Sequence, residues 1–197
     1  MNNKLKLKDI VLIALLTAIY LLIYFGAMML AAPLGQLGHA ISPGICSLLS
    51  GAVLIFMNRK VGKMWEYTIF TLLVMGAFAL MGGGYLPWLI TSVTGAVISD
   101  SFASRSNKSS ILKISLASGI MHVGQAWGSI IPATFFVDSF RSHWIERGMT
   151  PAEMEEHIRF SRGIMGIMST VISFVLAVAG VYIGYLILKK HLEKVKG

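Results

Sequence analysis

Asp, Glu, Lys and Arg are absent from four long windows of this sequence, which together hold about two-thirds of its 197 residues. A helix needs about 20 mainly apolar residues to cross a bilayer. Only 13% of the residues are charged, whereas soluble domains average about 25%. The pattern predicts an all-α integral membrane protein and argues against a soluble enzyme. The windows are residues 10–58, 67–99, 114–137 and 163–188.

Turn-forming residues divide the two longest windows. The first contains Pro33, Gly35, Gly38, Pro43 and Gly44, and the second contains Gly82-Gly83-Gly84-Tyr85-Leu86-Pro87. Such clusters mark breaks between helices. With one helix in each remaining window, the sequence predicts a six-transmembrane-helix bundle, with Pro132 ending the fifth helix. The expected helices cover about 10–30, 43–57, 66–82, 86–103, 112–132 and 163–188, within a single membrane domain spanning 1–197.

The basic residues are distributed unevenly between the two sides that six spans would create. The segments sharing a side with both termini carry 13 of the 17 basic residues. Because basic residues collect on the cytoplasmic side, both termini are predicted to be cytoplasmic. A multi-pass protein in the lipid bilayer accounts for the net charge of +8, so no nucleic-acid partner is expected. The four segments that share a side with the termini are residues 1–9, 58–65, 104–113 and 189–197.

The remaining arginines lie in one predicted outer loop, 133–162. Within it, Thr150-Pro151-Ala152-Glu153 combines an N-cap residue, a proline at the first helical position and an acid in the first turn. A short helix from 151 to about 160 is therefore expected. Arg141, Arg147 and Arg162 could pair with ligand carboxylates or form salt bridges within the loop.

Motifs for nucleotide or catalytic chemistry are missing from the sequence. It contains no Gly-x-x-x-x-Gly-Lys-Ser/Thr loop, no His-Glu-x-x-His and no Gly-x-Ser-x-Gly. A proton-driven pump would place carboxylates deep within its spans. Asp100, near the inner end of the fourth span, is expected to face water or a cytoplasmic partner. We expect a transport subunit, not an enzyme, powered by another subunit.

One ionisable residue lies deep within a predicted span, and such residues are functional candidates. His122 stands beside Met121, Gln125 and Trp127, a mixture that suits an apolar pocket with a few polar groups. Alternatively, His122 and Gln125 form hydrogen bonds between helices, and Trp127 is an interfacial anchor.

His39 follows the first span. Histidine and methionine both bind haem iron, so transported haem held by His39 or His122 is one prediction. No resident cofactor or protein metal site is expected.

Small residues four apart let helices approach closely. Ala14 and Ala18 have this spacing in the first predicted helix, and Gly180 and Gly184 have it in the last. Each pair could serve packing within the protein or docking of a partner.

Several features together resemble the S components of energy-coupling factor (ECF) transporters. They are the length, the six predicted spans, the basic cytoplasmic ends, the Ala14 and Ala18 pair and the missing ATP site. Ser42-Pro43-Gly44-Ile45-Cys46 and Gly82-Gly83-Gly84-Tyr85 resemble the Trep-Strep (MptD-like) branch. S components are bacterial plasma-membrane subunits that capture a vitamin or similar small molecule, then dock on a T component and two ATPase subunits.

The resemblance implies roles by position. Ala14 and Ala18 match the motif that contacts the T component, and the loop 31–42 matches the loop that closes over the pocket. The segment around 82–88, which contains Tyr85, and the fourth to sixth predicted helices match regions that line the pocket in relatives. Some members of this branch are associated with haem uptake, so haem is the first expected substrate and another vitamin-like or aromatic compound the second. A self-contained channel or secondary transporter, a membrane enzyme and a structural subunit stay open as alternatives.

Overall fold

The computed structural model describes residues 4–104 and 108–194, and within these ranges all regular secondary structure is helical. The prediction of an all-α protein is confirmed. The basic segments 1–9, 104–113 and 189–197 lie partly outside the described residues. In chain order the helices are α1 (Leu7–Ala31), the 3-10 helix η1 (Ala32–Leu34), α2 (Gly35–Lys60), α3 (Glu66–Leu80), α4 (Leu86–Ala103), α5 (Ile111–Phe135), α6 (Val137–Ile145), α7 (Pro151–Ser161) and α8 (Gly163–Lys194).

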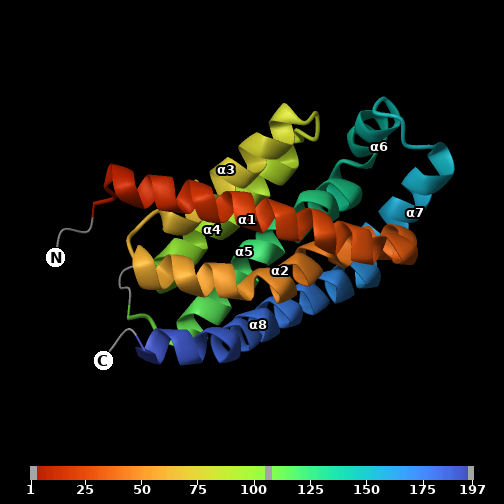
Figure 1. Ribbon diagram of the computed structural model, residues 1–197. Helices are drawn as coiled ribbons and strands as arrows, with labels where there is room; N and C mark the ends of the chain where they lie inside the picture. The colour runs from red at the N-terminus through yellow and green to blue at the C-terminus, as the bar shows by residue number, and fades with distance from the viewer. Residues whose placement is uncertain (1–3, 105–107, 195–197) are drawn as a thin grey trace.

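The bundle has two distinct ends (Figure 1). The start of α1 and the end of α8 lie at one end, and the short helices α6 and α7 lie at the other. We call α6 and α7 the cap. The cap is joined to the bundle through α5 on one side and α8 on the other, so it covers the end far from the basic termini.

The outside of the bundle is apolar. Leu22, Met29 and Leu186 are 74%, 78% and 68% exposed, while many serines and threonines are buried. Large exposed apolar surfaces are informative because soluble proteins avoid them. Two segments of the described chain are long and apolar enough to cross a membrane, Leu7–Lys60 and Gly163–Lys189, and α3 is a shorter apolar helix. Six crossings and cytoplasmic termini stay predictions.

The start of α2 differs from the prediction. Residues 35–42 were expected in a loop over 31–42, but α2 begins at Gly35 and Pro43 lies inside it. A proline within a helix leaves the carbonyl four residues earlier without its amide partner. Here that carbonyl belongs to His39, and the Ser42 hydroxyl donates to it at 2.8 Å. The neighbouring serine thus lets the helix continue through Pro43.

Two further differences concern α5 and the loop 133–162. Pro132 lies inside α5, which continues to Phe135 instead of ending at the proline. The Phe136 amide donates to the Pro132 carbonyl at 2.9 Å, which completes the last turn. The loop also contains α6, which the sequence analysis did not predict. The predicted short helix is present as α7, where Thr150 and Glu153 form a capping box.

Glycines bring α2 and α8 into backbone contact. A Cβ atom at Gly51 would collide with the Gly180 backbone, and one at Gly184 would collide with the backbone of Ala52. Gly180 and Gly184 therefore pack helices within this protein, which is one of the two roles left open for them. Gly95 and Gly124 bring α4 and α5 together in the same way.

The prediction that Asp100 faces water or a partner is wrong, because its side chain is fully buried. Its carboxylate accepts hydrogen bonds from the backbone amides of Tyr67 and Thr68, at 3.0 and 2.9 Å. These amides belong to the first turn of α3, where backbone donors have no partner inside the helix. Asp100 on α4 therefore caps α3 and fixes the position of that helix.

Candidate functional site

A cavity of about 300 Å³ lies between the cap and the bundle. Each of the helices α1 to α7 contributes at least one side chain to its lining. Ligand pockets in proteins range from about 300 to 1,000 Å³, so this one suits a small molecule.

Aromatic rings form much of the wall. On the bundle side, the Phe78 ring lies 4.9 Å from that of Tyr24 and 5.2 Å from that of Trp88, both in edge-on geometry. On the cap side, the rings of Tyr85 and Trp144 lie 5.9 Å apart. Aromatic faces on both sides favour a flat, largely apolar ligand.

Three polar side chains in the lining carry buried atoms without a hydrogen-bond partner among the described residues. They are Gln125 through Nε2, Ser161 through Oγ and Trp144 through Nε1. Gln125 and Ser161 are 3% and 1% exposed. An unpaired buried donor or acceptor costs about 1–3 kcal/mol, so native proteins rarely keep several in one place. Because these three residues also belong to the lining, the cavity is the candidate binding site.

The structure brings three of the six predicted binding residues together. His39, Tyr85 and Gln125 line the cavity. Trp127 does not, because it lies on another face of α5, is 45% exposed and donates to the Thr170 hydroxyl of α8 at 3.2 Å. This contact joins α5 to α8.

Met121 and His122 are fully buried and lie outside the cavity lining. His122 Nδ1 donates to the Ser118 carbonyl at 2.8 Å, so Nε2 accepts from the Tyr20 hydroxyl at 3.1 Å. Both ring nitrogens therefore have partners within the protein. His122 joins α5 to α1, which is the hydrogen-bonding alternative that the sequence left open, and neither nitrogen is free to bind iron in this arrangement.

Ala14 and Ala18 lie on the exposed face of α1. The two alanines therefore do not serve close packing inside the bundle. They form a shallow surface beside the exposed side chains of Val11 and Leu15, which are 51% and 61% exposed. Docking of a partner on this face stays a prediction.

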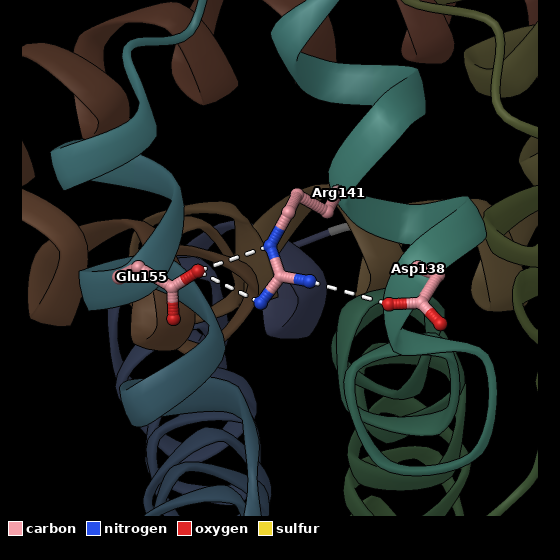
Figure 2. A network of polar contacts seen from close by, with 3 residues as sticks. All are labelled: Asp138, Arg141 and Glu155. Carbon is pink, nitrogen blue, oxygen red and sulfur yellow. Dashed lines mark hydrogen bonds and ion pairs between the residues drawn. The ribbon is translucent and has the colours of Figure 1, made fainter.

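An ion-pair network joins the two cap helices (Figure 2). Arg141 of α6 donates to Glu155 of α7 at 3.0 and 2.7 Å and to Asp138 at 3.3 Å. Arg147 contacts His143 Nδ1 at 3.0 Å. Arg141 thus forms salt bridges within the cap, as one of the two sequence alternatives predicted, and its guanidinium is already occupied by carboxylates.

A histidine pair holds α7 against α2. His157 Nδ1 donates to Gln36 Oε1 at 2.9 Å, and the His157 ring lies 4.9 Å from the His39 ring. Burial lowers the pKa of His157 to about 3, and the neighbouring His39 acts in the same direction. His157 is therefore neutral at physiological pH. Its Nε2 has no hydrogen-bond partner in the part of the chain that the structure describes.

Sequence reasoning named neither Trp144 nor Ser161 as a site residue, and it included Trp88 only within the segment 82–88 that lines the pocket in relatives. Trp88 follows the predicted glycine-rich turn directly, so that turn was an available signal. The contributions of Trp144 and Ser161 depend on how the cap folds back, which local sequence does not reveal. Among the described residues, no group of three or more His, Cys, Asp or Glu could hold a metal ion.

Comparison with curated proteins and with solved structures finds no match for this chain. A family model described as "Hypothetical bacterial integral membrane protein (Trep_Strep)" matches residues 7–194, which include every helix of the bundle and the cap. The match agrees with the apolar exterior and with the two segments able to cross a membrane. On this evidence of sequence and structure, the chain belongs to the Trep_Strep family of bacterial integral membrane proteins.

Proposed function

We propose that this protein is the substrate-capture subunit, or S component, of an ECF-type importer. The observation that carries the proposal is the capped cavity, with buried polar atoms left unpaired, inside an apolar bundle. A binding site beneath a covering element is what a capture subunit needs. The sequence has no phosphate-binding loop, so we propose that it is not an enzyme and that its energy comes from two ATPase subunits.

The proposed orientation places the cap outside the cell. Six helices, α1 to α5 and α8, would cross the bacterial plasma membrane, and the basic ends of α1 and α8 would face the cytoplasm. The cavity then opens toward the medium, where a nutrient is first met. The α6 and α7 helices would act as the cover in place of the loop 31–42, because most of that loop is part of α2.

The proposed docking face for the T component is the exposed side of α1. Ala14 and Ala18 leave room there for a helix of the partner to approach closely. Because the alanines are not used inside the bundle, a partner can reach them without rearrangement of the fold.

The cavity favours the smaller of the two expected ligand classes, a vitamin-like or aromatic compound. Its volume lies at the lower end of the usual range. Haem carries two carboxylates. None of the described lining residues is a lysine or an arginine that could pair with them. His39 is the single histidine of the described lining, since His122 is engaged with Tyr20.

Purification from native membranes tests this function. We expect tagged protein, extracted in a mild detergent, to carry a T component and two ATPases with it. Recovery of the tagged protein without ATPases would overturn the proposal. So would ATP-independent accumulation, in sealed vesicles, of whatever compound co-purifies with the protein, because that result identifies a self-contained secondary transporter or channel.

A further inference from the structure

The charge of the cavity lining restricts its ligand. None of the described residues in the lining is Asp, Glu, Lys or Arg. A charged ligand group that leaves water needs an opposite charge or several hydrogen bonds to replace its hydration. The arginines that lie near the lining residues in sequence, Arg141, Arg147, Arg159 and Arg162, are not part of the lining, and Arg141 is bound by Glu155 and Asp138 (Figure 2). The described lining therefore offers no charge to pair with a charged ligand group.

The unpaired polar atoms restrict the ligand further. Trp144 Nε1 can only donate a hydrogen bond, and the Gln125 amide nitrogen also donates. Both are buried and lack partners among residues 4–104 and 108–194. A ligand that satisfies them must present acceptors, such as ring nitrogens or carbonyl oxygens. Ser161 adds a hydroxyl that can donate as well.

The donors come from different parts of the fold. Gln125 lies on α5 in the bundle, whereas Trp144 and Ser161 lie on the cap helices α6 and α7. A ligand that accepts from both groups would connect the cap to the bundle. Binding would then hold the cap closed, because contacts made only in the closed state shift the equilibrium toward it.

Resting on the proposed capture function, we infer that the cavity takes an uncharged, flat heteroaromatic compound whose acceptor atoms bridge Gln125 on α5 to Trp144 and Ser161 on the cap. The aromatic walls formed by Phe78 and Trp88 on one side and Tyr85 on the other contact its two faces.

The first experiment identifies the compound that co-purifies with the full chain. Protein isolated from native membranes is denatured, and the released small molecules are analysed by mass spectrometry and absorption. A neutral heteroaromatic compound is the expected result. Haem, recognised by its Soret band, or any carboxylate or phosphate compound would overturn the inference.

A probe set tests the same inference when the purified protein is empty. The probes are quinoxaline-2-carboxamide, quinoxaline-2-carboxylate and naphthalene, which share a flat bicycle but differ in charge and acceptors. Binding is measured by quenching of tryptophan fluorescence in detergent. We expect the carboxamide to bind at least tenfold more tightly than the other two. Equal binding of all three, a preference for the carboxylate, or no binding at all would overturn the inference.

Variants assign the donors. Gln125→Met keeps the size of the side chain and removes its donor, and we expect it to weaken carboxamide binding about three- to tenfold. Thr94→Val changes an exposed residue of α4 outside the cavity lining, and it should bind like the parent. Naphthalene binding should be the same in both variants. If Gln125→Met retains full carboxamide affinity, the assigned donor is wrong.

The outcomes separate this inference from the proposed importer. If ATPases co-purify with the protein but its ligand is anionic, the inferred ligand class is wrong and the proposed importer role stands. If the ligand is neutral but no ATPase co-purifies, the importer role is wrong and the inferred ligand class stands.

Discussion

The His157 imidazole of α7 donates a hydrogen bond to the Gln36 amide oxygen of α2 over 2.9 Å, and this contact holds the cap on the bundle. About one turn further along α2, the His39 ring lines the ligand cavity and also lies beside His157. The docking of the cap and the lining of the cavity therefore share one pair of rings.

This shared pair predicts that acid loosens the cap. Burial lowers the pKa of His157 from 6.5 to about 3, so the docked state binds fewer protons than an undocked state. Docking is then fully stable above pH 6.5 and weakens as the pH falls toward 3. His39 on α2 is a titratable neighbour of His157, and its protonation adds positive charge beside it. We expect the hydrogen-exchange protection factor of α7, taken relative to the intrinsic exchange rate at each pH, to fall about tenfold between pH 7.5 and pH 5. In His157→Gln the fall in protection should be much smaller, and an equal fall in this variant would contradict the assignment.

The ion-pair network of the cap should contribute little to overall stability. Arg141 is partly exposed, and exposed pairs contribute about 0–1 kcal/mol each. We expect Arg141→Ala to lower the free energy of cap docking by about 1 kcal/mol, measured by hydrogen exchange in α6 and α7. Arg159→Ala is the matched control, since its partner Glu156 lies on the same helix. A large loss of stability across the whole bundle would show that the network supports more than the cap.

The buried link between α1 and α5 should be structural. In Tyr20→Phe, His122 Nε2 loses its donor, and we expect a loss of about 1–3 kcal/mol in the free energy of unfolding, measured by denaturation in mixed micelles. His122→Leu together with Tyr20→Phe removes both partners and should restore part of the loss. The same double variant should bind quinoxaline-2-carboxamide like the parent. A strong loss of carboxamide binding in this variant would instead show that His122 contributes to the ligand site.

Close contact between α2 and α8 should not tolerate a side chain at Gly51. Even the single methyl group of Gly51→Ala meets the backbone of Gly180, so the two helices must separate. We expect destabilisation of about 4 kcal/mol or more and poor recovery of monodisperse protein on size-exclusion chromatography. Gly76→Ala is the control, because its added methyl group has open space around it. Normal behaviour of Gly51→Ala would disprove the direct backbone contact.

The exposed alanines of α1 should matter for partners and not for folding. We expect Ala18→Trp to fold normally, because position 18 faces outward, and to lose co-purification with the T component and ATPases. Val175→Trp places the same bulk on an exposed position of α8 and should retain the partners. Thermal stability of both variants should match the parent. Unchanged co-purification of Ala18→Trp would show that the partner binds elsewhere.

The ends of several helices could be predicted because their signals are local. Pro87 near the start of α4 and the Thr150 and Glu153 pair at the start of α7 act within one turn of the chain, and both predictions agree with the structure. The early start of α2 could not be predicted from the rule that proline breaks helices. It depends on the Ser42 hydroxyl reaching the His39 carbonyl, a compensation that the rule ignores. The sequence does contain a signal for α6, because the apolar residues Val137, Phe140 and Trp144 have helical spacing.

The candidate site was predictable only in part. Gln125 was found because a polar side chain within an apolar window is conspicuous, and it lines the cavity. His122 was singled out by the same reasoning, but it lies one turn away and pairs with Tyr20. Polarity alone does not tell a ligand contact from a bond between helices, because both satisfy a buried group. Trp144 enters the site only through the packing of the cap.

The contact between Gly51 and Gly180 has a mechanical consequence. Because no side chain separates the two backbones at this contact, α2 and α8 form a stiff double rod that runs from the basic end to the cap. Any rearrangement that lets a molecule in or out must therefore pivot around this rod. The two short helices at its far end, held to α2 by the hydrogen bond from His157 to Gln36, are the parts that can move.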